Sequence, residues 1–279
     1  MSELPGPLPP TTTQTIAGLH VETFLPSGTP KGVVVITHGY AEHCGRYHEV
    51  ANVIVQAGWA ALSYDVRGHG KSAGDRGYIE RFDIYLDDLD AMIAAAKALV
   101  PAGAKVILLG HSHGSLITLR ALVGEAAPKV TAAIVSSPYL GLKTPLPGWK
   151  KLLGRVANRL APKLNQPNEI RDDQLTNDKQ KQAEHGADKV CFPTANVRWF
   201  AESSAAQDYV YAHADRISVP TTWLVGGADP LTDPARSRAV ASKVKGATYH
   251  DLVGLKHEVF NEVDRASVFA KLSAALASA

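Results

Sequence analysis

The pentapeptide Gly110-His111-Ser112-His113-Gly114 places a potential nucleophile between two glycines, in the pattern G-x-S-x-G. It follows the short apolar run 105–109 and precedes the helix-compatible stretch 115–123. A strand, a sharp turn and a helix in this order hold a serine on a strained bend, where a base and a substrate can both reach the hydroxyl. The pattern therefore indicates Ser112 as a candidate nucleophile.

A serine hydroxyl is a poor nucleophile at neutral pH unless a base takes its proton. Asp229 follows the strand-like run 222–227, and His257 lies in a loop after the strand-like run 247–252. Ser112, Asp229 and His257 therefore occur in the order nucleophile, acid, base. Each lies just beyond a predicted strand, at the end where open α/β sheets carry their chemistry. We expect His257 to be the general base and Asp229 to fix the tautomer of its ring.

The oxyanion formed during acyl transfer needs backbone N–H donors. One is expected from His113, the residue after the nucleophile. The other is expected from Tyr40, in the loop that follows the apolar run 32–37. Loss of one such donor typically lowers the rate by ~10²–10³.

Other acids compete with Asp229. Asp65 lies in a segment typical of a turn closed by its own side chain. Asp233 precedes Pro234 and is expected to cap the helix that begins there. Asp251 is a weaker competitor. Asp229 is favoured, and the nearness of Asp233 in sequence leaves the choice between these two open.

Three histidines compete with His257. We expect His38 to shape the turn before Tyr40, and His111 to point away from the site because it neighbours the serine on a sharp bend. His250 lies inside a predicted strand and is expected to serve packing or the surface.

Several longer segments carry a family resemblance. Residues 38–47 (HGYAEHCGRY) resemble the H-G-x-G-E-H-x-x-R-Y run of monoacylglycerol lipases and bacterial lysophospholipases. Residues 65–78 are similar to the same family's D-x-R-G-H-G-x-S-x-G-x-R-G, and residues 198–200 and 257–262 match it further. The resemblance covers most of the chain except the first dozen residues and the segment of about 139–187.

The resemblance implies an α/β-hydrolase fold with a cap over the site, and a serine esterase acting on a single-chain acyl ester. By matching position it supports the roles of five residues: Ser112, Asp229, His257, Tyr40 and His113. The chain departs from the family where Ala41 replaces a frequent glycine, His113 a common methionine and Ser115 another glycine, and Tyr40 is bulkier than many residues at its position. None of these changes removes a required N–H.

Composition agrees with an α/β enzyme. The chain has 279 residues, of which 45% are hydrophobic, enough for a substantial core. Short β-branched runs alternate with longer helix-like segments, which predicts a mostly parallel central sheet flanked by helices. Helices are expected over the following ranges: 46–57, 82–99, 115–123, 234–244 and 262–277. We expect a core formed by residues 1–138 and 188–279, with 139–187 inserted as a cap or lid.

The inserted segment is expected to determine substrate choice. Trp149, Leu152, Leu153 and Val156 fall on one face of a predicted helix, and we expect them to bind substrate. Residues 139–168 contain several lysines and arginines but no acid. The favoured interpretation packs the apolar face on the pocket and leaves the charges solvated. The alternative is an interfacial helix that contacts anionic lipid or admits a lipid tail.

Other functional classes are not supported by the sequence. Cys44 and Cys191 are too few for a disulfide framework, so we expect a reducing, cytoplasmic setting, with peripheral membrane contact as the alternative. No motif has metal-ligand spacing, and no cofactor is expected. A net charge of +2, with no basic run interleaved with aromatic residues, gives no argument for nucleic-acid binding. Residues 4–10 are expected to be extended and loose, without signal-peptide features, and no apolar run is long enough to span a membrane.

Taken with the resemblance, these residues predict a hydrolase that cleaves carboxylic esters of single-chain lipids through an acyl-enzyme, with a small lipid ester as its partner. A short-chain carboxylesterase or an acyltransferase would use the same three residues. A non-catalytic ligand binder on the same fold is less favoured, because all three are present.

Overall fold

The computed structural model describes residues 11–279, apart from one side chain in the inserted segment. The expectation for residues 4–10 lies outside the described residues. Eight strands form the central sheet in the order β1-β2-β4-β3-β5-β6-β9-β10. Their bounds are β1 Thr11–Ile16, β2 Leu19–Phe24, β3 Gly32–Thr37, β4 Ala60–Tyr64, β5 Lys105–His111, β6 Ala132–Ser136, β9 Thr221–Gly226 and β10 Ala247–Leu252.

The six strands from β4 to β10 run parallel, and β1 and β2 continue the sheet antiparallel at one edge. Every residue of β3, β4 and β6 is buried, as expected for strands covered on both faces. The expected mostly parallel sheet flanked by helices is therefore confirmed. Both antiparallel strands went unpredicted; β1 is polar and largely exposed, so it carries no apolar alternation.

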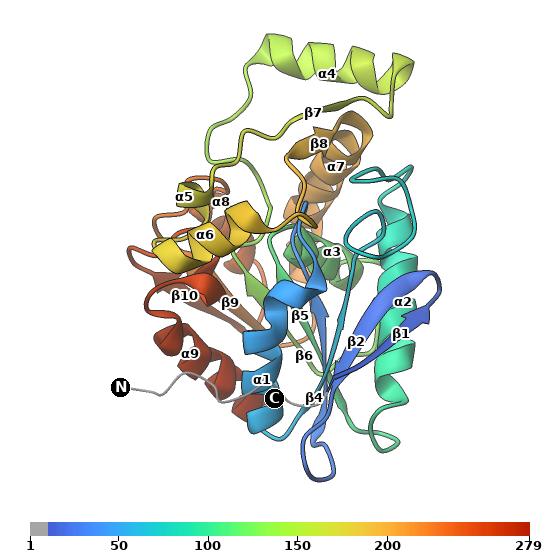
Figure 1. Cartoon of the computed structure of the whole chain (residues 1–279), viewed down its shortest axis with the longest axis vertical. Coiled ribbons are helices and arrows are strands. Elements are labelled where there is room, and N and C mark those ends of the chain that lie inside the picture. Colours follow the sequence, from blue (N-terminus) through green and yellow to red (C-terminus); the bar gives the residue numbers. More distant parts are fainter. Residues whose placement is uncertain (1–10) are drawn as a thin grey trace.

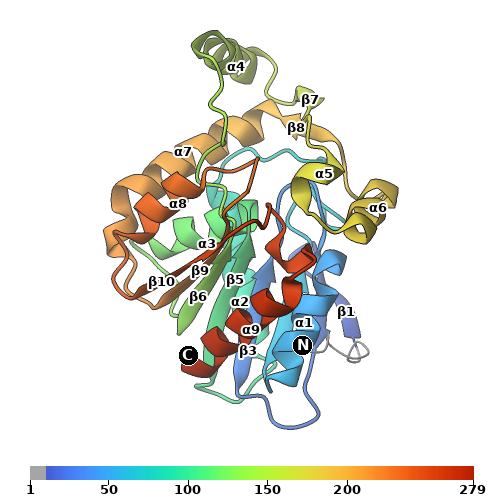
Figure 2. The ribbon, with the colours of Figure 1, turned by 90° about the vertical axis from the view of Figure 1, so that its left-hand side faces the viewer.

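Helices cover both faces of the sheet (Figures 1 and 2). One core layer packs under α1 (His48–Gln56) and α9 (Arg265–Ser278). The other packs under α2 (Asp83–Lys97), α3 (His113–Leu122), α7 (Val197–His213) and α8 (Pro234–Ala241). The predicted helices occur close to their expected bounds, although a short 3-10 turn, η1 (Cys44–Tyr47), precedes α1. None of the helices among the described residues is long and apolar enough to cross a membrane.

The excursion between β6 and β9 contains most of the remaining elements. They are α4 (Gly148–Leu160), β7 (Asn165–Pro167), α5 (Asp172–Leu175), α6 (Lys179–Ala187), β8 (Thr194–Asn196), then α7 and the turn η2 (Ala214–Arg216). Strands β7 and β8 pair as a small antiparallel ribbon. Helix α4 lies at the outer end of the molecule in both views (Figures 1 and 2). A last 3-10 turn, η3 (Val259–Asn261), precedes α9.

Candidate active site

Ser112 occupies a strained turn between β5 and α3. Its backbone angles are φ 50° and ψ −112°, in a region that L-residues rarely adopt. The two glycines of the pentapeptide make the turn sterically possible. A Cβ on Gly114 would lie 2.0 Å from the carbonyl oxygen of Thr37, and one on Gly110 would lie 2.5 Å from that of Gly114. The flanking glycines are therefore required by close backbone approach.

Hydrogen bonds to the end of β6 hold this turn. The N–H of Ser112 donates to the Ser136 carbonyl at 2.9 Å, and its own carbonyl accepts from Tyr139 N–H at 3.0 Å. The hydroxyl of Ser115 donates to the Gly110 carbonyl at 2.7 Å and accepts from Ser136 N–H at 3.1 Å. The serine at a position often occupied by glycine therefore fastens the turn to the neighbouring strand.

Asp229 and His257 meet beyond the carboxyl ends of β9 and β10. The Nδ1 atom of His257 donates to Oδ2 of Asp229 at 2.7 Å, and both side chains are almost fully buried. The same carboxylate accepts from the Thr232 hydroxyl at 2.6 Å and from the N–H groups of Leu231 and Thr232. Because an ionised carboxylate only accepts, the proton of a neutral His257 lies on Nδ1, and Nε2 keeps a lone pair.

The pair favours a charged state on each partner. Burial raises the pKa of Asp229, but the His257 charge and the hydrogen bonds from His257, Thr232 and Leu231 lower it more. Burial likewise lowers the pKa of His257. The charge and hydrogen bond of Asp229, together with Glu258 and Glu42, raise it above its ordinary value. An imidazolium at position 257 is therefore stabilised, as a general base requires once it has taken a proton.

The loop after β3 lies directly against the serine turn. A Cβ on Gly39 would lie 3.3 Å from both Cβ of Ser112 and the His111 ring. Ala41 has φ 67°, a left-handed conformation that explains why glycine is frequent at this position. Gly39, the residue before Tyr40, thus lies against Ser112.

A buried ion network joins this loop to the residue after His257. Arg46 donates to Glu42 at 2.7 Å and, through both terminal nitrogens, to the two oxygens of Glu258 at 2.7 Å. Glu42 also accepts from Gly39 N–H and from the Tyr47 hydroxyl. The sequence motif contained these residues, but only the fold brings Glu258 to positions 42 and 46.

The competing acids have other partners. Asp65 accepts from the N–H groups of Cys44 and Lys71, which confirms the turn closed by its side chain. Asp233 caps α8 by accepting from Ala235 N–H at 3.0 Å, as predicted. Asp251 pairs with Arg238 at the surface. Asp229 is the acid found on His257.

The expectation that His111 points away from the site is wrong. Its ring centroid lies 4.9 Å from that of His257, and its Nδ1 is 3.1 Å from the Ser136 hydroxyl. Burial, together with the His257 charge, lowers the pKa of His111 to about 4, so His111 stays neutral at working pH. His38 shapes the loop as expected, because its ring accepts from Val66 N–H and contacts the Gly39 carbonyl.

The favoured packing of the α4 helix is also wrong. The exposed fractions of its apolar side chains are 62% for Trp149, 61% for Leu152, 58% for Leu153 and 48% for Val156. The less exposed positions are instead Gly154, Ala157 and Asn158. Arg198 of α7 donates to the Asn158 carbonyl at 3.4 Å. Small residues allow the closer approach to α7, and the apolar face is left exposed.

Two groups of potential metal ligands occur among the described residues. They are His20, Glu22 and Cys44, and His43, Asp188 and Cys191. In the second group His43 donates to Asp188 at 2.8 Å, and in the first Glu22 lies 3.2 Å from His20 and 2.7 Å from His48. These hydrogen bonds satisfy the polar side chains without an ion, so we assign a metal to neither group.

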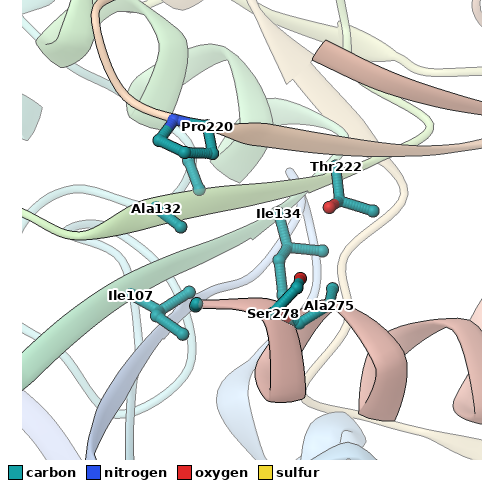
Figure 3. A pocket seen from close by; sticks show the side chains of 9 residues that line it. Ile107, Ala132, Ile134, Pro220, Thr222, Ala275 and Ser278 are labelled. Atoms are coloured by element: carbon teal, nitrogen blue, oxygen red, sulfur yellow. The ribbon is translucent and has the colours of Figure 1, made fainter. Parts of the chain in front are cut away.

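A small cavity of about 30 Å³ lies at the amino ends of the central strands, and Figure 3 shows the side chains that line it. Its lining includes Ile107, Ala132 and Pro220 and contains no ionisable side chain. Ser112, Asp229 and His257 all lie beyond the opposite ends of their strands, so this cavity is separate from the candidate active site.

Comparisons with known proteins agree with this geometry. Residues 28–264 match the family described as serine aminopeptidase, S33. Phospholipase YtpA of Bacillus subtilis is 30% identical over 86% of this chain and 93% of its own length. The monoacylglycerol lipase of Mycolicibacterium smegmatis is 29% identical over 88% of this chain and 87% of its own. The crystal structure of Paleococcus ferrophilus monoacylglycerol lipase superposes with a TM-score of 0.84 at 28% identity, covering 93% of this chain and 98% of that one.

Proposed function

The chain belongs to the serine aminopeptidase S33 family of α/β-hydrolases, and from this premise we propose that it cleaves carboxylic esters of single-chain lipids through an acyl-enzyme. The observations that support the proposal are the buried Asp229–His257 pair, the His257 ring 4.9 Å from that of His111, and the strained turn of the next residue, Ser112. The relatives named phospholipase and monoacylglycerol lipase support a lipid ester as the substrate, rather than a compound with another kind of acyl group.

The reaction follows from the roles of these side chains. The Ser112 hydroxyl attacks the ester carbonyl while Nε2 of His257 takes its proton, and Asp229 stabilises the imidazolium. The N–H groups of Tyr40 and His113 stabilise the oxyanion. The imidazolium then protonates the departing alcohol. In the second half His257 activates water, which attacks the acyl-enzyme and releases the fatty acid.

A hydrolysis panel tests the substrate class. It compares a short p-nitrophenyl ester, a monoacylglycerol, a lysophospholipid and an aminoacyl p-nitroanilide. We expect the single-chain lipid esters to have the highest kcat/KM. Preference for the short ester would favour the carboxylesterase alternative. Turnover of the anilide alone would favour the peptidase activity in the family's name. Acyl transfer is distinguished by supplying an alcohol acceptor and analysing the products.

A fluorophosphonate probe tests whether the serine is active at all. The wild-type protein is expected to be labelled, and Ser112→Ala is expected to remain folded and unlabelled. Ser63→Ala is a control, because it removes a buried hydroxyl in β4 that has no hydrogen-bond partner among the described residues. An unlabelled wild-type protein would favour a non-catalytic ligand binder.

We further propose that residues 139–187 form a cap, and that the exposed apolar face of α4 contacts lipid aggregates or membranes. Trp149, Leu152, Leu153 and Val156 would then guide the substrate from the lipid phase. Exposed Lys150, Arg155 and Arg159 on the same helix complement anionic head groups. The free thiols of Cys44 and Cys191 support a reducing, cytoplasmic location. Flotation with anionic and with neutral vesicles tests the contact, and absence of binding at low salt would contradict it.

A further inference from the structure

Trp199 in α7 contacts both segments that carry the proposed oxyanion donors. Its ring stacks on Tyr40 with centroids 3.5 Å apart and an angle of 22°. Its indole Nε1–H donates to Nε2 of His113 at 3.1 Å. The side chain is buried, and its ring also stacks with that of Tyr139, with centroids 5.7 Å apart. One side chain therefore contacts the loop after β3 and the start of α3 at the same time.

The hydrogen bond fixes the state of His113. An indole nitrogen only donates, so Nε2 accepts and the ring proton lies on Nδ1. Nδ1 is buried, with no hydrogen-bond partner among the described residues. The ring is surrounded by aromatic side chains, including Tyr85 at 5.0 Å and Phe82 at 5.9 Å. Burial holds the pKa of His113 far below its ordinary value, so it is a neutral acceptor. The hydrogen bond from Trp199 therefore holds the His113 ring in place.

The same segment of chain holds Tyr40 at a second point. Asn196 donates its N–H to the Tyr40 hydroxyl at 3.1 Å, and that hydroxyl donates to the Gly77 carbonyl at 3.0 Å. The Asn196 side chain caps α7 by accepting from the N–H groups of Arg198 and Trp199. Its amide also donates to the Leu164 carbonyl, just before β7. Asn196 therefore links the start of α7, which carries Trp199, to the chain between α4 and β7.

We propose that Trp199 is a positioning residue for the oxyanion site, which sets the spacing between the Tyr40 and His113 N–H groups by holding both residues against α7. This role of Trp199 rests on the proposed esterase function. It extends that function to a residue that touches none of the reacting groups. A displacement of α7 would be transmitted to both donors together.

A double-mutant cycle tests the hydrogen-bonded half of this proposal. Trp199→Phe keeps an aromatic ring against Tyr40 and removes the indole donor together with one ring of the buried side chain. It is expected to lower kcat on a p-nitrophenyl ester by about threefold to tenfold, the worth of one net hydrogen bond, with little change in KM. In a His113→Met background the same change should cost less than about twofold, because the acceptor is gone. Equal losses in both backgrounds would overturn the proposal.

Two further measurements separate positioning from general stability. A boronic acid mimics the tetrahedral oxyanion, so its affinity should fall by the same factor as kcat, whereas affinity for the fatty-acid product should not. Trp223→Phe is the matched control, since Trp223 is also buried and donates its indole N–H to Thr221 at 2.9 Å in β9. Trp223→Phe should have a Tm comparable to that of Trp199→Phe, but it should leave kcat and boronate affinity unchanged.

The outcomes distinguish this inference from the proposed function. A wild-type protein that hydrolyses esters, with a Trp199→Phe variant of unchanged kcat, would overturn the inference alone. A Trp199→Phe variant that loses boronate and product affinity in proportion to a lowered Tm would also overturn it, because the role would then be structural. A wild-type protein that is unlabelled and inert would overturn both.

Discussion

The Asp229 carboxylate and the His257 imidazole form a hydrogen bond of 2.7 Å, although 28 positions separate them and each lies on the loop after a different strand. Strands β9 and β10 are parallel neighbours, so the loops after them emerge side by side. The carboxylate is further held by three donors from residues 231 and 232. Its orientation is therefore set before any substrate arrives.

Replacing Asp229 with asparagine should remove most activity and leave the fold intact. The amide cannot hold the ring proton on Nδ1 and stabilise the imidazolium as the carboxylate does, and comparable changes lower kcat by ~10⁴. The measurement is kcat on a p-nitrophenyl ester, with circular dichroism as the folding check. Asp233→Asn is the control; asparagine also caps helices, so both stability and activity should be nearly unchanged. The opposite pattern would transfer the role of the acid to Asp233.

The acid limb of the pH profile should lie above pH 6.5. Only neutral His257 can accept the serine proton, and its pKa lies above the ordinary value of 6.5 because Asp229, Glu258 and Glu42 outweigh the effect of burial. At pH 6.5 more than half of the enzyme is then protonated and inactive, and kcat/KM rises as the pH increases through the raised pKa. A profile of kcat/KM between pH 5 and 9 checks this.

Asp229→Asn provides the comparison for that profile. Removing the negative charge leaves burial as the largest influence on His257, so the limb should move to lower pH as overall activity falls. A limb below pH 6.5 in the wild-type protein, or one that does not move in the variant, would contradict this assignment of the titrating group.

Arg46 should be important for stability because it neutralises two buried carboxylates. Arg46→Met leaves Glu42 and Glu258 buried without a counter-charge, which typically costs about 3–5 kcal/mol. In the wild-type protein the pKa of each carboxyl is lowered, although burial is the largest single influence and raises it. That stability is present above the unfolded pKa and is lost as the pH falls.

In the variant, burial should dominate and raise the pKa of both carboxyls. The two groups then become protonated as the pH decreases, so the difference in stability between variant and wild type should shrink toward acid pH. Urea unfolding at neutral and mildly acid pH measures this difference. Arg238→Met removes an exposed pair with Asp251 and should cost about 0–1 kcal/mol at either pH. Equal costs for the two variants would contradict the buried network.

Much of the site was predictable because its signals are local. The G-x-S-x-G turn, the runs before Asp229 and His257, and the cap at Asp233 each depend on neighbours in sequence. The contact between Trp199 and His113 spans 86 positions, and no periodicity connects them. The position of the His111 ring beside His257 was missed for the same reason.

The packing of the α4 helix could not be predicted from the sequence for a different reason. Its sequence offers an apolar face and a narrow face of small residues, and either can pack on a neighbour. The structure packs the face with Gly154 and Ala157 near α7. Helical periodicity identifies the two faces, but it does not say which one finds a partner.

The exposed face of α4 gives the last prediction. Replacing Leu152 and Leu153 together with serine should leave Tm nearly unchanged, because these side chains are 61% and 58% exposed and pack on little. Turnover of a monoacylglycerol in vesicles should fall several-fold, whereas turnover of a dissolved short ester should not, because only the aggregated substrate needs an apolar surface to dock on. Leu252→Ser is the opposite control, since this leucine is 6% exposed in β10 and should lower Tm strongly. An equal loss on both substrates in the Leu152/Leu153 variant would place these side chains in the acyl pocket instead of on a docking surface.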